Sequence, residues 1–220
     1  MRLLIIITDL GSFNNFLSEL AIKIIQSNHT VDVICSNNKV ININDKGNFI
    51  DKGIKMHFVD FPRGFNIYKH YKASIQIYRL AKKINPNLVH VHFTTGIFTT
   101  ILYKKLPFYT IGTFHGLGFT SLKGIKRIMF KIVEFFCFSR LDQIWVLNNF
   151  DLENIKGKFK KKTFKLDTAG VGCDLSKFDI NSRIVDKKNE LNITSLLYIS
   201  QTIPPNPLWK HVLIKKSIPT

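Results

Sequence analysis

Short apolar runs alternate with amphipathic stretches through residues 3–156, and this alternation limits the fold more than any other feature. Runs typical of buried strands cover residues 3–7, 31–35, 54–61, 88–92, 108–113 and 143–147. Stretches with a helical period lie between or after them, at residues 16–27, 67–84, 97–105, 122–138 and 150–156. Strands that alternate with helices form a parallel sheet with right-handed crossovers. The sequence therefore predicts an α/β fold with a Rossmann-like, doubly wound parallel sheet.

The last fifty residues differ in character. Residues 163–178 and the polar sequence that follows are typical of a linker, and residues 193–199 resemble the first strand of a second domain. Prolines then interrupt the chain, and no helical period follows. We therefore expect a first domain over residues 1–180, a linker over 181–192, and over 193–220 the incomplete start of a second domain with an irregular tail.

Two strand endings place histidines where a doubly wound sheet binds ligands. The predicted strand at 88–92 carries His90 and His92, and the strand at 108–113 runs into His115. In an open parallel sheet, ligands lie outside the carboxyl ends of the strands. Gly116 and Gly118 follow His115 at once and allow the backbone to come close to a substrate. The spacing therefore indicates a substrate site around His115.

His90 and His92 permit two interpretations. Side chains two apart on a strand share a face, and paired histidines at this spacing bind metal in some proteins. No convincing third ligand accompanies them, so we expect no metal. The preferred interpretation is that His92 lines the substrate cleft and that His90 is buried with a backbone partner.

The charge balance of the chain favours anionic partners. Lys and Arg number 32 and Asp and Glu number 15, which gives a net charge of +17. Such a charge suits phosphorylated substrates, acidic lipids or nucleic acid. The lysines are spread along the chain, and no helix-turn-helix, zinc or RNA-binding pattern supports specific nucleic-acid recognition. The three cysteines are far apart, so neither a disulfide framework nor a zinc ribbon is indicated.

Two basic segments are compatible with a membrane surface. The helix predicted at 122–138 has an apolar face that includes Ile125, Ile128 and Ile132, and a charged face that includes Lys131 and Glu134. It would either lie on an anionic bilayer or, as the preferred interpretation, cover the sheet with its charges in water. A second segment of lysines is the better candidate for plain electrostatic attachment, with a solvated loop as the equal alternative; these are Lys156, Lys158, Lys160, Lys161, Lys162 and Lys165.

No apolar run approaches the ~20 residues that span a bilayer. The apolar run at the amino terminus is too short for a signal peptide. We therefore expect a cytoplasmic protein that associates peripherally with the inner face of the plasma membrane.

Several segments taken together resemble a known family. In order, they are a first strand followed by a glycine turn at Gly11, PNLVHVH at 86–92, TFHGLGF at 113–119, IWVLNNFDLENI at 144–155 and GVGCDLSKF at 170–178. Over residues 1–200 the chain resembles the amino-terminal half of family-4 retaining glycosyltransferases of GT-B architecture. The similarity is greatest to members that build bacterial capsule, O-antigen and other lipid-linked glycans.

The resemblance implies an acceptor-side domain that works with a second, donor-binding domain. A nucleotide-sugar, most often a UDP-sugar, would be the co-substrate, with no metal and no other cofactor. His115 matches the histidine that hydrogen-bonds near the reacting sugar, and Gly11 matches the glycine that lets the first loop approach the diphosphate and the acceptor. The same interpretation assigns substrate binding to His92, Gly116 and Gly118, and offers Arg63 to an anionic acceptor, with a solvated arginine as the alternative.

The chain departs from the family in its last residues. The donor domain of the family carries two glutamates eight residues apart, and no two glutamates here have that spacing. Gln201 stands where the family usually has arginine, and Pro204, Pro205 and Pro207 replace a Lys-Gly pair. We therefore expect that the donor-binding half is missing through a frameshift near Ile203, and that the chain alone is weakly active or inactive. The alternatives are an inactive acceptor- or partner-binding domain and, less favoured, a nonspecific nucleic-acid-binding protein.

Overall fold

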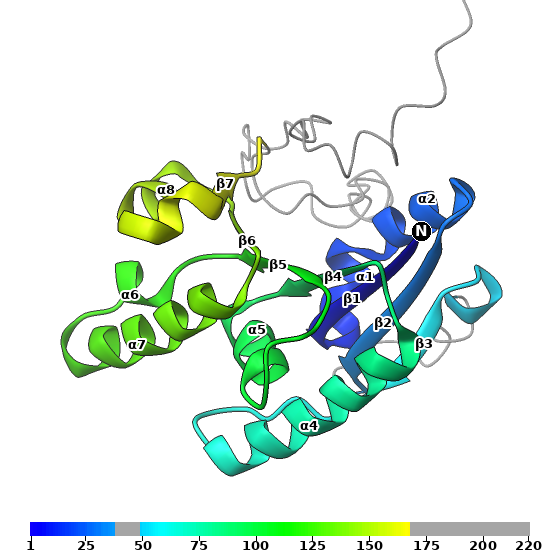
Figure 1. Cartoon of the computed structure of the whole chain (residues 1–220), viewed down its shortest axis with the longest axis horizontal. Helices are drawn as coiled ribbons and strands as arrows, with labels where there is room; N and C mark the ends of the chain where they lie inside the picture. The colour runs from blue at the N-terminus through cyan, green and yellow to red at the C-terminus, as the bar shows by residue number, and fades with distance from the viewer. Residues whose placement is uncertain (38–48, 168–220) are drawn as a thin grey trace, which may run out of the picture.

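Parallel strands form one sheet in the order β3-β2-β1-β4-β5-β6-β7. The computed structural model describes residues 1–37 and 49–167 (Figure 1). The strands are β1 (Arg2–Asp9), β2 (Thr30–Ser36), β3 (Lys55–Phe58), β4 (Leu88–His92), β5 (Tyr109–Phe114), β6 (Gln143–Val146) and β7 (Thr163–Lys165). The helices are α1 (Leu10–Phe16), α2 (Ser18–Gln26), α4 (Ile67–Ile84), α5 (Thr94–Ile101), α6 (Gly118–Ser121), α7 (Gly124–Arg140), α8 (Asn149–Asn154) and the 3-10 turn η1 (Gly157–Lys162). The predicted α/β class and doubly wound parallel sheet are confirmed.

The order of the strands reverses between β1 and β4, which pair directly. Leu3 is in register with Leu88, and Ile6 with Val91. Strands β2 and β3 extend the sheet on one side of this pair, and β5 to β7 extend it on the other. In such sheets the crevice at the reversal, outside the carboxyl ends of the strands, is where ligands bind. The topology therefore predicts a ligand site near the carboxyl ends of β1 and β4.

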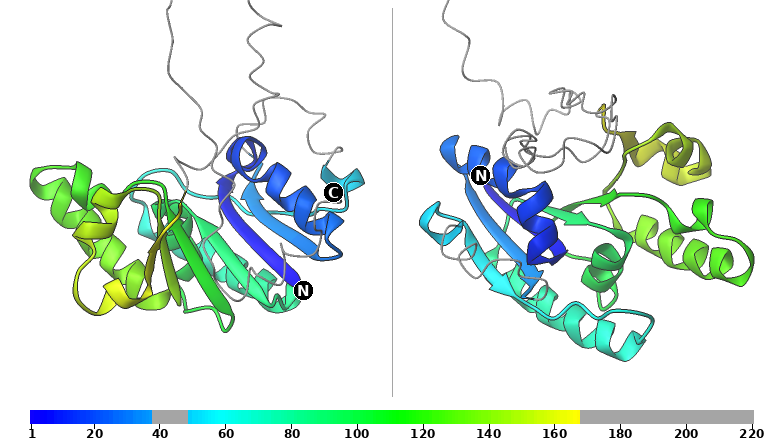
Figure 2. Two further views of the ribbon diagram at one scale, coloured as in Figure 1. Left: turned by 90° about the horizontal axis from the view of Figure 1, so that it is seen from above. Right: turned by 180° about the vertical axis from the view of Figure 1, so that it is seen from behind.

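Helices cover both faces of the sheet (Figures 1 and 2). Apolar residues of α4, α5 and α7 pack on one face, and those of α1 and α2 pack on the other. Both ends of α4 (Ile67–Ile84) agree with the predicted range, because local signals in the sequence set them. Asn66 caps its first turn by accepting a hydrogen bond from the Lys69 amide, and Asn85 ends it in the left-handed conformation before Pro86.

Several expected boundaries are wrong. Gly11 does not form a turn but lies inside α1, because the Asp9 carboxylate caps that helix immediately after β1. Residues 163–165 do not begin a linker; they form β7, which pairs with β6. The remaining linker, the expected strand at 193–199 and the GVGCDLSKF segment at 170–178 lie outside the described residues.

Helix α7 packs differently from the preferred interpretation. Only Glu134, Cys137 and Phe138 are buried along it, all in its carboxyl-terminal half. The apolar side chains of its first half are instead exposed, with exposed fractions of 75% for Ile125 and 67% for Ile132. The amino-terminal end of α7 extends away from the strands, so no sheet lies beneath it (Figure 1). The expectation that this apolar face covers the sheet is therefore wrong for the first half of the helix.

Candidate functional site

Three histidines meet at the carboxyl ends of β4 and β5. The ring centroids of His90 and His92 lie 4.1 Å apart, since the two side chains share one face of β4. His92 Nδ1 and His115 Nε2 are joined by a hydrogen bond of 3.3 Å. His90 Nε2 lies 2.7 Å from the Thr113 hydroxyl on the neighbouring strand. His90 is buried as predicted, but its partner is this side chain rather than the backbone.

The cluster is held in the neutral form. Burial, followed by the charge of His115, lowers the pKa of His90 to about 3. Burial and the two neighbouring histidines lower the pKa of His92 well below its usual range. Burial lowers the pKa of His115 to about 4. At neutral pH each ring therefore has one donor and one acceptor nitrogen.

Aromatic side chains cover part of the His115 ring. The Phe93 ring packs against the His115 ring at 3.9 Å between centroids, and Phe16 of α1 approaches from 6.3 Å. Phe93 adopts a φ of 66°, which a bulky residue rarely does. Such a conformation costs about 1–3 kcal/mol and occurs most often at functional sites. The strain therefore supports a functional role for the end of β4.

The loop that follows His115 is held by two buried carboxylates. Glu134 of α7 accepts hydrogen bonds from the Gly118 amide at 2.8 Å, the Phe119 amide at 3.1 Å and the Thr94 hydroxyl at 3.1 Å. Asp151 accepts from the Leu117 amide and, at 2.9 Å, from the Thr120 hydroxyl. Burial raises the pKa of Glu134, while the hydrogen bonds it accepts oppose that rise.

The predicted position of Glu134 on a solvated face is wrong, because the residue is fully buried. Three of its four neighbours one turn away along α7 are apolar, namely Phe130, Cys137 and Phe138, and the fourth is Lys131. A carboxylate within an apolar helical stripe is a signal that it satisfies donors elsewhere, since buried charges need partners. That signal was available in the sequence.

The two glycines of the loop serve different needs. Gly116 has a φ of 152°, and a Cβ atom added there would meet no atom within 4 Å. Gly118 has an ordinary φ, but its Cβ would lie 2.2 Å from Phe130 Cδ1. Gly116 is thus required by the backbone, and Gly118 by the close approach of α7.

Gly118→Ala is expected to lower the free energy of unfolding by about 1–3 kcal/mol, because the new methyl group must displace Phe130. The matched control is Gly96→Ala in α5, whose Cβ would lie 3.5 Å from the nearest atom, Thr8 Cγ2. That change is expected to be neutral or to stabilise the protein slightly. Urea unfolding of both variants measures the difference, and equal stabilities would contradict the role given to Gly118.

The other predicted site residues occupy the same edge of the sheet on different segments of the chain. His92 is buried rather than open to a cleft and is linked to His115. Arg63 follows β3 and lines a polar cavity of about 360 Å³ with Asp9, Ser36 and Thr95. Gly11 lies in the first turn of α1, directly after β1. The structure thus joins His92, His115, Gly116 and Gly118, and places Gly11 in α1 and Arg63 on the loop after β3.

Within residues 1–37 and 49–167 there is no group of three or more His, Cys, Asp or Glu side chains arranged to hold a metal ion. The same residues contain no helix that is both long enough and apolar enough to cross a bilayer. Two of the clustered lysines have partners inside the protein: Lys162 donates to the Leu141 carbonyl, and Lys165 lies 3.6 Å from Asp167.

The parallel sheet, with its ligand-binding edge at the strand reversal, defines a Rossmann-like domain of the kind found in GT-B proteins. Residues 6–148 match the sequence pattern of the family described as glycosyl transferase 4-like, and the chain belongs to that family. The resemblance found in the sequence is thereby confirmed.

One curated relative is the UDP-Gal:alpha-D-GlcNAc-diphosphoundecaprenol alpha-1,3-galactosyltransferase of Escherichia coli. It is 28% identical over 135 residues, which cover 59% of this chain and 35% of the relative. The chain thus spans about a third of the length of this enzyme.

Solved structures show the same fold at low identity. Sucrose-phosphate synthase from Thermosynechococcus elongatus matches with a TM-score of 0.54 and 12% identity, over 80% of this chain and 49% of that one. A glycosyltransferase from Rickettsia africae matches with a TM-score of 0.52 and 15% identity, over 81% of this chain and 45% of that one. These structures support the fold alone.

Proposed function

We propose that residues 1–180 form the acceptor-side domain of a glycosyltransferase. The reaction joins a hydroxyl oxygen of the acceptor to the anomeric carbon of a sugar and releases the nucleoside diphosphate that carried it. The donor would be a UDP-sugar, bound by a second domain, and no metal or other cofactor would be needed. The acceptor would be a lipid-linked diphosphate saccharide used for a surface polysaccharide such as O-antigen or capsule.

One observation carries the proposal: a partly buried His115, whose pKa is lowered by burial to about 4, opens a glycine loop at the carboxyl edge of a GT-B-type sheet. A neutral imidazole can donate or accept a hydrogen bond at a sugar hydroxyl without introducing a full charge. The contact with His92 engages Nε2 of His115, so Nδ1 is the nitrogen that His115 can offer to a sugar hydroxyl. The relative with a lipid-diphosphate acceptor supports the acceptor class.

The surface of α7 supports contact with a membrane that presents such an acceptor. Ile125, Ile128 and Ile132 are exposed beside the exposed cations Lys126 and Arg127. An apolar helix surface flanked by basic side chains binds the interface of anionic bilayers, and each cation near the surface adds about 1 kcal/mol. This arrangement favours peripheral attachment at the cytoplasmic face through α7, in preference to the lysines of η1.

His115→Ala is expected to weaken binding of a soluble GlcNAc-diphosphate acceptor with a short lipid chain by about tenfold, the equivalent of one lost hydrogen bond. Isothermal titration of the purified chain measures this loss. His29→Ala is the control, because His29 lies before β2 at the opposite edge of the sheet.

Two further outcomes decide between versions of the proposal. Acceptor binding without sugar transfer from UDP-galactose would identify the chain as an acceptor-binding part only. Failure to bind the acceptor, or equal binding by the His115 and His29 variants, would overturn the assignment of the site.

A further inference from the structure

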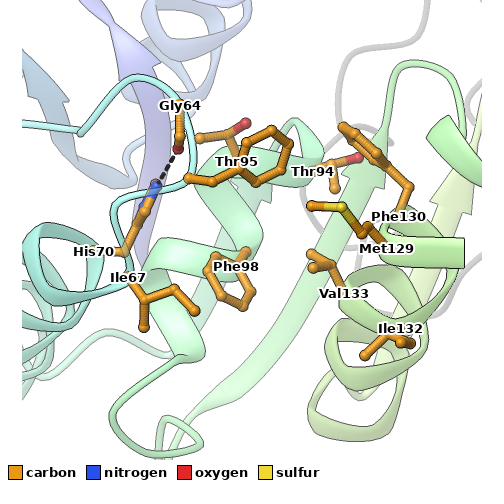
Figure 3. Close-up of a pocket in the computed structure, with 11 residues that line it drawn as sticks. Gly64, Ile67, His70, Thr94, Thr95, Phe98, Met129, Phe130, Ile132 and Val133 are labelled. Atoms are coloured by element: carbon orange, nitrogen blue, oxygen red, sulfur yellow. Dashed lines mark hydrogen bonds between the residues drawn. The ribbon is translucent and has the colours of Figure 1, made fainter. Parts of the chain in front are cut away.

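An apolar groove lies between α7 on one side and α5 with the start of α4 on the other (Figure 3). Its volume is about 470 Å³, within the range of sites that bind small molecules. Carbon-rich side chains form its walls, chiefly Phe65, Ile67, Phe98, Met129, Ile132 and Val133. Ile67 and Ile132 stand on opposite walls and are both more than 60% exposed. Exposed apolar side chains that gather in one groove, rather than being scattered singly, are typical of ligand-binding surfaces.

Two of the three polar side chains that line the groove, His70 and Thr94, are already engaged by the protein, and the third, Thr95, is exposed where the groove meets the polar cavity. His70 Nδ1 bonds to the Thr99 hydroxyl, and His70 Nε2 bonds to the Gly64 carbonyl. The Thr94 hydroxyl donates to Glu134. A sugar would need free hydrogen-bond partners to replace its water, whereas a hydrocarbon chain would not. The groove therefore suits a hydrocarbon ligand.

A polar cavity adjoins the groove, and Gly64 and Thr95 line both. The exposed guanidinium of Arg63 belongs to this second cavity. The Asp9 carboxylate lies there too, but it accepts hydrogen bonds from the Ser12 amide and the Thr8 hydroxyl as the cap of α1. Arg63 thus places a positive charge at the end of the apolar groove. This combination is complementary to an amphiphile with an anionic head group.

We propose that the groove binds the isoprenoid chain of the lipid-linked acceptor and that Arg63 binds its diphosphate. This rests on the proposed function, because that function supplies the lipid-diphosphate acceptor. The exposed isoleucines of α7 continue from the groove, so the chain can pass from the bilayer along this helix into the protein. Its saccharide would then lie at the carboxyl edge of the sheet, on the side of His115.

The test is isothermal titration of the full chain with three probes below their aggregation concentrations: farnesyl diphosphate, farnesol and inorganic diphosphate. Farnesyl diphosphate is expected to bind at least tenfold more tightly than either of the others, because only it engages both cavities. Equal affinity for farnesyl diphosphate and inorganic diphosphate would overturn the groove. Equal affinity for farnesyl diphosphate and farnesol would overturn the role of Arg63.

Variants locate the two contacts separately. Ile132→Glu and Ile67→Glu, on opposite walls, are each expected to weaken farnesyl diphosphate and farnesol binding about tenfold, because each places a charge against the chain. Ile50→Glu is the matched control: Ile50 is 60% exposed and lies away from the groove. Arg63→Ala is expected to weaken farnesyl diphosphate about tenfold and to leave farnesol binding unchanged.

Equal binding by the Ile132, Ile67 and Ile50 variants would refute the groove assignment. Sedimentation of the same proteins tests another occupant, because a dimer that only the groove variants abolish would show that a second copy fills the groove. His115→Ala should leave the binding of all three probes unchanged, since none of them carries a sugar. These experiments therefore test lipid binding in the groove separately from the proposed function. The proposed function is tested by the binding of the saccharide-bearing acceptor.

Discussion

Replacement of Glu134 by leucine is expected to lower the free energy of unfolding by about 3–5 kcal/mol, since it leaves one buried and two partly buried donors without their acceptor. Those donors are the amides of Gly118 and Phe119 and the hydroxyl of Thr94. The change also removes the carboxylate that joins α7 to the loop after His115. Urea unfolding measures the loss, and hydrogen exchange at the Gly118 and Phe119 amides is expected to become faster.

Glu134→Gln is the matched control. Its amide oxygen can still accept from the loop, so the expected loss is only about 1–2 kcal/mol. A second control, Glu153→Leu, removes an exposed carboxylate of α8 and should change the stability little. If Glu134→Leu proved as stable as Glu153→Leu, the loop would not depend on Glu134.

Acid is expected to destabilise the protein well above the pH at which ordinary carboxylates titrate. The pKa is lowered to about 3 for His90 and to about 4 for His115, and it is also lowered for His92. The folded protein therefore binds fewer protons than the unfolded chain, in which histidine has a pKa of about 6.5. The contribution of the neutral histidines to the free energy of unfolding is fully present above pH 6.5 and is lost as the pH falls towards their folded-state pKa values.

Each neutral histidine contributes a fall of about 1.4 kcal/mol per pH unit below pH 6.5, so the three together approach ~4 kcal/mol per unit. The raised pKa of Glu134 acts in the opposite direction, because its protonation favours the folded state. Urea titrations at pH 7.5, 6.5 and 5.5 measure the slope. His115→Ala should reduce the slope by about one third. A stability that does not change between pH 6.5 and 5.5 would show that the cluster is not held neutral.

Local sequence signals predict the fold well where backbone chemistry sets the boundaries. The bounds of α4 and β4 agree with the predicted ranges 67–84 and 88–92, because Asn66, Asn85 and Pro86 act within a few residues of the helix ends. Helix α7 shows the opposite case. The spacing of its apolar residues correctly predicts a helix. What the apolar face of that helix packs against depends on how far the sheet extends, which is a tertiary property.

Part of the candidate site was predictable, because its position follows from the order of strands and helices along the chain. His115, His92, Gly116 and Gly118 lie at strand ends, and the parallel topology brings such ends to one edge. The strained backbone of Phe93 and the partnership of Glu134 with residues sixteen positions earlier arise from tertiary packing, and periodicity does not encode them. Gly11 was expected to form a turn because a glycine after a strand often does, whereas the Asp9 cap begins a helix there.

The pairing of β1 with β4 has a consequence for synthesis on the ribosome. Strand β1 is made first, yet one of its two partners is complete only when His92 has been added. Until then the apolar sequence Leu3–Ile7 has an unpaired edge on that side, and such an edge recruits strands from other chains. Pairings this distant in sequence also form slowly. The nascent chain is therefore expected to need a chaperone during the interval between β2 and β4, whatever the stability of the finished sheet.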